Sequence, residues 1–224
     1  MITRSAIVTN GVIHQSRGPI GADSPLYWSI ERRNHRWEDD LLNRDEAVAL
    51  LEENLANVNL VRHCLATEAV LRGLARRMDE DQDLWGVTGL LHDVDYESTS
   101  DDPARHGLAG ADMLEGKLPE EALHAIRSHN AEHTGVERES DLDWLLSAGE
   151  SITGLIVATA LVYPDRKLAS VKPRSVLKRM NVSGFARSVS RERIRDCDRA
   201  GLELAEFVSI ALDSMKSIAP TLGL

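Results

Sequence analysis

Histidine and aspartate side chains occur once in each of four consecutive stretches of helical pattern, mostly at their ends. His63 lies within the first stretch, the pair His92-Asp93 ends the second, His106 begins the third and His129 ends the fourth. Imidazole nitrogens and carboxylate oxygens suit Zn, Fe, Mn and similar divalent ions, and a carboxylate at a helix end can bridge two ions. Two ions about 3.5–4 Å apart hold a phosphoryl group and activate water near neutral pH. These residue types, at these places, therefore favour a metal-dependent site.

Such side chains need helices to position them, and from residue 44 onward apolar residues recur with a helical period. Asn43 and Glu46 form a capping-box pattern, and prolines 103, 119 and 164 mark helix boundaries. The predicted helices span residues 43–56, 60–78, 84–92, 103–114, 119–129, 142–162, 175–180 and 190–217. Residues 142–162 are nearly all apolar, so we expect this helix at the centre of the core. The sequence predicts an all-α fold: one helical domain over residues 41–224, with a largely irregular N-terminal extension over residues 1–40.

Composition excludes several protein classes. Hydrophobic residues make up 42% of the 224 residues and aromatic residues only 4%, which favours packed helices over a β-sandwich. The longest apolar run, residues 152–163, is too short to cross a bilayer, and we expect no signal peptide because Arg4 leads into a polar stretch. Two cysteines, Cys64 and Cys197, are too few for a disulfide scaffold. We therefore expect a cytoplasmic protein with no membrane partner.

Charge is unevenly distributed along the chain. The net charge is −10, but residues 37–165 carry −19 and residues 166–199 carry +8. The acidic region argues against nucleic acid as a partner, because neutralising phosphates needs a broad basic face. The basic stretch could meet a phosphate group locally, or it could be a solvated face. A homodimer is an open possibility.

The motifs resemble a known family. His63 followed by His92-Asp93 is similar to the signature of the HD superfamily of metal-dependent phosphohydrolases. The His-Gly-x-x-Gly-Ala segment at residues 106–111, together with His129, resembles the binuclear subset of that superfamily, and residues 63–215 resemble small bacterial predicted HD hydrolases. The resemblance implies that His63, His92 and Asp93 hold one ion and that His106 and His129 hold a second. It also implies that Asp93 bridges the two ions.

Position 150 departs from the family pattern. The family has an aspartate on the central helix at the place where this chain has Glu150, just before Thr153-Gly154. A glutamate keeps the carboxylate but adds a methylene, so the resemblance implies a metal ligand with altered geometry, or one ion that is weakly held. An unpaired carboxylate in so apolar a helix would cost several kcal/mol. We therefore expect a cationic group to face Glu150.

Other polar residues near the motifs are candidates for catalysis or substrate binding. Asp95 is a candidate general base or orienting group, or else a plain loop carboxylate. His133, one helical turn after His129, is predicted to support a ligand or to contact substrate. Phosphate needs positive partners besides the metal ions, and the candidates for this are Arg127, Lys172 and Lys178.

Three functions are compatible with this set of residues. The leading one is a phosphohydrolase with two divalent ions (Fe, Mn, Zn, Mg or similar) that acts through metal-activated water on a phosphate ester or nucleotide-type small molecule. Some HD proteins instead hold two irons and activate O₂ to oxidise organophosphonates or polyols. The third is a non-catalytic or degenerate HD domain that binds a ligand, for which the replacement at Glu150 is the only support.

Overall fold

The computed structural model describes residues 42–224, so the predicted extension over residues 1–40 lies outside the described residues. Within the described part the chain forms helices and no strand, which confirms the all-α prediction. The α-helices are α2 (Arg44–Asn54), α3 (Val58–Met78), α4 (Gln82–Leu91), α5 (Leu108–Leu114), α6 (Glu120–His129), α7 (Ala131–Thr134), α8 (Asp141–Leu161), α9 (Pro173–Met180), α10 (Arg191–Arg195), α11 (Leu204–Ser217) and α12 (Ala219–Leu222), with two short 3₁₀ helices, η1 (Leu168–Ser170) and η2 (Asp196–Ala200).

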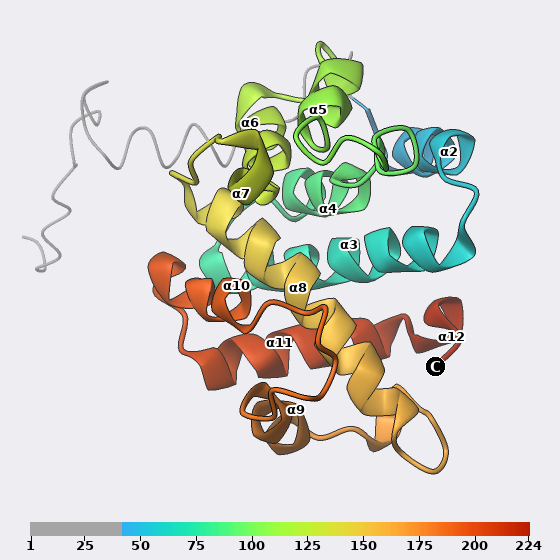
Figure 1. Cartoon of the computed structure of the whole chain (residues 1–224), viewed down its shortest axis with the longest axis vertical. Helices are drawn as coiled ribbons and strands as arrows, with labels where there is room; N and C mark the ends of the chain where they lie inside the picture. The colour runs from blue at the N-terminus through green and yellow to red at the C-terminus, as the bar shows by residue number, and fades with distance from the viewer. Residues whose placement is uncertain (1–41) are drawn as a thin grey trace, which may run out of the picture. The chain divides into compact units, whose positions relative to one another are not determined.

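Two long helices, α3 and α8, form the centre of the fold (Figure 1). Helix α3 packs against α4, α8 and α11, and α8 also packs against α6, α9 and α10. By length and composition alone α8 could cross a membrane, but most of its apolar window is buried against these neighbours. Ile152, Leu155 and Ile156 on α8 are fully buried. Helix α8 is therefore the central core helix that the apolar run predicted.

The start of α2 is capped as the sequence predicted. The side chain of Asn43 accepts hydrogen bonds from the backbone N–H groups of Asp45 and Glu46, and Glu46 accepts one from the backbone N–H of Asn43. Nearby, Arg44 of α2 and Arg72 of α3 both donate to the buried Glu68 carboxylate. This cluster fixes α2 against α3.

Two predicted helices differ from the observed ones. The helix predicted over residues 103–114 begins only at Leu108, because the buried carboxylate of Asp95 binds the backbone N–H groups of Gly107 and Gly110 and holds the preceding residues in turns. The single helix predicted over residues 190–217 was also wrong. Gly201 adopts a left-handed φ of 74°, which ends one helical stretch and separates α10 and η2 from α11.

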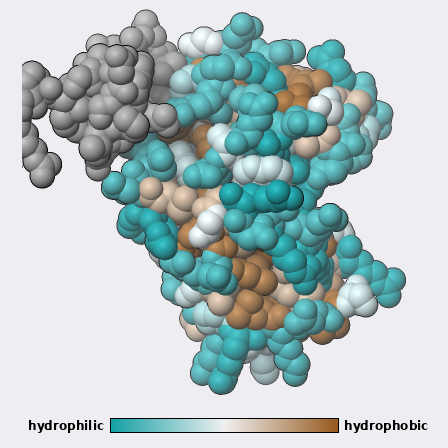
Figure 2. Space-filling view, turned by 90° about the vertical axis from the view of Figure 1, so that its left-hand side faces the viewer, coloured by the Kyte–Doolittle hydropathy of each residue, from teal (hydrophilic) through white to brown (hydrophobic). Residues whose placement is uncertain are grey.

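The surface of the domain is mostly polar. The face in Figure 2 is largely hydrophilic, with smaller groups of hydrophobic side chains between the polar ones. Among the described residues, the large hydrophobic side chains that are exposed are Val58, Tyr96, Leu161, Val162 and Val182.

Candidate metal centre

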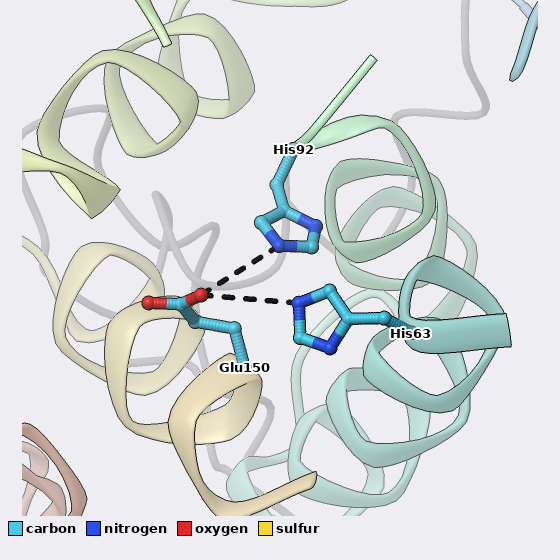
Figure 3. Close-up of side chains that lie close together, drawn as sticks. All are labelled: His63, His92 and Glu150. Atoms are coloured by element: carbon cyan, nitrogen blue, oxygen red, sulfur yellow. Dashed lines mark ion pairs between the residues drawn. The ribbon is translucent and has the colours of Figure 1, made fainter. Parts of the chain in front are cut away.

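Three ligand-type side chains from three separate segments point toward one another (Figure 3). His63 comes from α3, His92 caps the C-terminal end of α4, and Glu150 comes from the middle of α8. One carboxylate oxygen, Oε2 of Glu150, lies 3.9 Å from His63 Nε2 and 3.8 Å from His92 Nε2. These separations are too long for hydrogen bonds, and they leave room for an ion among the three atoms. This group could hold a metal ion.

Asp93 connects this group to a second one. Its Oδ2 atom lies 3.6 Å from His63 Nε2, whereas Oδ1 lies 3.3 Å from His92 Nε2. The same Oδ1 atom lies 3.2 Å from His106 Nε2 and 3.5 Å from His129 Nε2. Asp93, His106 and His129 form a second group that could hold a metal ion. Because α4 ends at Leu91, His92 and Asp93 leave the helix and both face the cluster.

Each of the four imidazoles is oriented by its other ring nitrogen. His63 Nδ1 lies 3.1 Å from Thr153 Oγ1, and His92 Nδ1 lies 2.8 Å from the carbonyl oxygen of Gly89. His129 Nδ1 donates to the carbonyl oxygen of Ile126 one helical turn earlier. Such contacts fix the ring and leave Nε2 as the ligand atom, as is usual for metal-binding histidines.

The fourth imidazole, His106, is oriented by a carboxylate instead. Its Nδ1 lies 2.9 Å from Asp95 Oδ1, and Asp95 Oδ2 accepts hydrogen bonds of 2.8 Å from the backbone N–H groups of Gly107 and Gly110. Each glycine allows a close contact that a side chain would obstruct. A Cβ atom on Gly110 would lie 3.2 Å from the Asp95 carboxylate, and one on Gly107, whose φ is +89°, would lie 2.8 Å from the Ile126 carbonyl oxygen. Gly110 thus leaves room for the Asp95 carboxylate, and Gly107 leaves room for Ile126 and His129 of α6.

The protonation of these residues fits a metal site. Burial lowers the pKa of His92 to about 4, so its imidazole is neutral at pH 7, and its buried Nε2 atom has no hydrogen-bond partner. Burial raises the pKa of Asp93, but the neighbouring histidines outweigh burial and hold that pKa well below its ordinary value. A neutral imidazole with a vacant Nε2 beside an ionised carboxylate is the donor set that divalent transition metals prefer.

A cation faces Glu150, as the sequence predicted. Arg193 of α10 donates from Nη1 to Glu150 Oε1 at 2.9 Å, and it also donates to Glu132 of α7. Glu150 therefore has one oxygen on Arg193 and the other facing His63 and His92. The glutamate side chain, one methylene longer than that of aspartate, allows the carboxylate to reach both Arg193 and the two histidines.

A pocket of about 660 Å³ opens beside the first group. It lies between α7, α8 and α10 and includes His63 and Glu150 in its wall. Its lining residues are His63, Glu132, His133, Arg138, Glu150, Ser151, Gly154, Ser188, Val189, Ser190, Glu192, Arg193 and Asp196.

The structure brings only one of the predicted substrate residues to this pocket. His133 lines it, with Nδ1 held 2.9 Å from Asn130 Oδ1. Arg127 instead bonds the exposed Glu120, Lys172 is exposed outside the pocket lining, and Lys178 lines a separate depression beside Tyr163.

Several residues at the site were missed from the sequence. Thr153 contacts His63, Arg193 contacts Glu150, and Arg138 lines the pocket. Thr153 belongs to the Thr-Gly pair after Glu150, which gave a local signal. Arg193 is one of eleven basic residues between positions 166 and 199, and no local pattern distinguishes it, because its partners lie on distant helices.

Comparisons with known proteins agree with this geometry. The family model described as "HD domain" matches residues 60–160, the segment that contributes His63, His92, Asp93, His106, His129 and Glu150. Neither curated proteins nor solved structures give a match. Residues 60–160 therefore form an HD domain, the domain that characterises a superfamily of metal-dependent hydrolases, and the clustered histidines and carboxylates lie within it.

Proposed function

We propose that this protein is a metal-dependent phosphohydrolase that acts on a phosphate ester. The observation that carries the proposal is the position of Asp93, whose two oxygens face both groups of imidazoles beside an open polar pocket. His63, His92 and Glu150 would hold one ion, His106 and His129 the other, and Asp93 would bridge them. Two divalent ions bound there supply charge neutralisation for a phosphoryl group and lower the pKa of water.

Asp95 acts in this scheme as an orienting group for His106 and not as a general base. Both of its oxygens are occupied, one by His106 and the other by two backbone N–H groups, and its side chain is fully buried. A carboxylate so engaged cannot accept a proton from water in the pocket without losing these bonds. His133 lines the same pocket as His63 and Glu150. We assign it to contact with the substrate phosphate or leaving group.

We propose a phosphorylated small molecule as the substrate and the cytoplasm as the place of action. The two cysteines of the chain, Cys64 and Cys197, are free and buried, which fits a reducing compartment. A homodimer stays a prediction that the size of the protein in solution will decide.

Metal content per chain, measured on tag-free protein prepared without chelators, tests the proposal first. Two equivalents of Fe, Mn, Zn or a similar ion, together with hydrolysis of phosphate esters, would support it. Asp93→Ala should abolish both, whereas Asp112→Ala, an exposed aspartate on α5, should change neither.

Other results would refute the proposal. No bound metal after reconstitution would favour a ligand-binding HD domain. Two irons with O₂ consumption and no hydrolysis would favour the oxygenase chemistry.

A further inference from the structure

The pocket beside the metal centre is lined almost entirely by polar side chains. Pockets for drug-sized ligands are usually lined mainly by hydrophobic and aromatic groups. Here Val189 supplies the one large apolar side chain among the described lining residues, and no aromatic ring other than imidazole is among them. Trp144, on the neighbouring helix α8, does not line the pocket and is covered by the guanidinium groups of Arg138 and Arg199. The described walls therefore offer no surface on which a nucleobase could stack.

Hydroxyl and carboxylate groups take the place of apolar ones. The serines at positions 151, 188 and 190 line the pocket, and Ser188 forms no hydrogen bond with any described residue. Glu192 and Asp196 also line it, and neither side-chain carboxylate makes a hydrogen bond or ion pair with the described residues. Free carboxylates accept hydrogen bonds, and serine hydroxyls both donate and accept them. These groups are complementary to a ligand with several hydroxyl groups.

The charge of the lining disfavours a polyphosphate. Apart from the ligand Glu150, three carboxylates (Glu132, Glu192 and Asp196) and two guanidinium groups (Arg138 and Arg193) line the pocket. Arg193 is bonded to Glu132 and Glu150, and Arg138 is bonded to Glu132, so neither cation is free for a phosphate chain. Negative charge outside the metal centre would repel a diphosphate or triphosphate. A single phosphate at the metal ions would leave the acidic wall to the rest of the ligand.

We propose that the pocket selects a compact phosphate monoester rich in hydroxyl groups, such as a sugar or polyol phosphate, over a nucleotide. This inference rests on the proposed function for the position of the phosphate group. The organic part of the ligand lies against Ser188, Glu192 and Asp196, and its hydroxyl groups donate to the carboxylates.

Ribose 5-phosphate and adenosine 5′-monophosphate form a matched pair for the test, because they share the ribose and the phosphate and differ in the base. We would measure binding of each to the full-length, metal-loaded protein by calorimetry, and hydrolysis by release of phosphate. Ribose 5-phosphate should bind about tenfold more tightly, because the base must lose water without gaining a stacking partner. Equal or tighter binding of the nucleotide, or no binding of the sugar phosphate, would overturn the inference. Tight binding without hydrolysis would refute the proposed function and leave the selectivity standing.

A serine substitution tests the contact directly. Ser188→Ala should weaken binding of ribose 5-phosphate by about threefold to tenfold relative to inorganic phosphate, the loss expected for one neutral hydrogen bond. Ser183→Ala changes an exposed serine of the same loop that does not line the pocket, and it should leave this ratio unchanged. An unchanged ratio in Ser188→Ala, with Glu192→Gln and Asp196→Asn equally without effect, would contradict the proposed contact of the hydroxyl groups with this wall.

Discussion

Replacing Arg193 with methionine should weaken metal binding although Arg193 is not itself a ligand. The substitution leaves the Glu150 carboxylate, whose side chain is 14% exposed, without its cation. Loss of one partner from a fully buried ion pair costs about 3–5 kcal/mol of folding free energy. Because the Arg193 side chain is 21% exposed, solvent screens the pair, and we expect about 1–2 kcal/mol. Loss of a group that orients a ligand typically lowers metal affinity by about 10- to 100-fold.

Metal affinity would be measured by competition with a chromogenic chelator, and folding free energy by urea denaturation of the metal-free protein. Arg195→Met is a matched control, because Arg195 lies on the same short helix and is exposed, and within residues 42–224 its side chain donates only to the backbone of Arg191. Glu150→Asp shortens the side chain, so it should lose the bond to Arg193. Adding Arg193→Met to Glu150→Asp should therefore lower metal affinity and folding free energy only slightly further.

Two results would refute this reasoning. Unchanged or tighter metal binding in Arg193→Met would mean that the imidazoles alone position Glu150 and that the guanidinium competes with the ion. Additive losses in the double variant would mean that Arg193 acts through the fold and not through Glu150.

Three further predictions concern the second group of ligands. Burial lowers the pKa of His106, but its bonds to Asp93 and Asp95 outweigh burial and raise the pKa to about 10. At pH 7 a metal ion must displace this proton, so metal affinity should rise about tenfold per pH unit. Calorimetry in buffers of different ionisation enthalpy should detect the release of at least one proton. Metal affinity that does not change between pH 7 and 8 would contradict this prediction. Asp95→Asn removes one of the two carboxylates, so the slope with pH should become smaller, and an unchanged slope would assign the effect to Asp93 alone. Gly107→Ala should destabilise the protein by about 3 kcal/mol in thermal or urea unfolding and lower its metal content, because the new Cβ would clash with a backbone carbonyl. Gly116, with a φ of +73°, has open space around it, so Gly116→Ala should cost only about 1 kcal/mol of folding free energy. Equal losses in the two variants would show that backbone strain, and not the clash, determines the destabilisation.

The sequence predicted those features of the fold and of the site that depend on the pattern of neighbouring residues. The period of the apolar residues located the helices, and the position of His92-Asp93 at a helix end indicated that both side chains could face one cavity, as they do. The extent of the helix around residues 190–217 was not predictable in this way, because a single glycine at position 201 interrupts an otherwise continuous pattern.

Contacts between residues far apart in the sequence were harder to predict. The sequence indicated that a cation must face Glu150, because a buried carboxylate needs one, but it did not identify which cation. Arg193 was not singled out because the contact depends on how α10 packs against α8. Asp95 was likewise ambiguous until its three hydrogen bonds were known.

The break at Gly201 separates the short segment of α10 and η2 from the long helix α11. The ligand side chains sit on or beside core helices, whereas Glu192, Arg193 and Asp196 belong to the short segment of α10 and η2. That segment is anchored by few buried side chains, among them Ile194 and Cys197. Substitutions at Glu192 and Asp196, unlike those at Arg193, therefore change the pocket wall without removing a contact of a side chain that could bind metal. In the proposed function, these two positions can vary separately from the metal centre, so that new substrates could evolve on an unchanged chemistry.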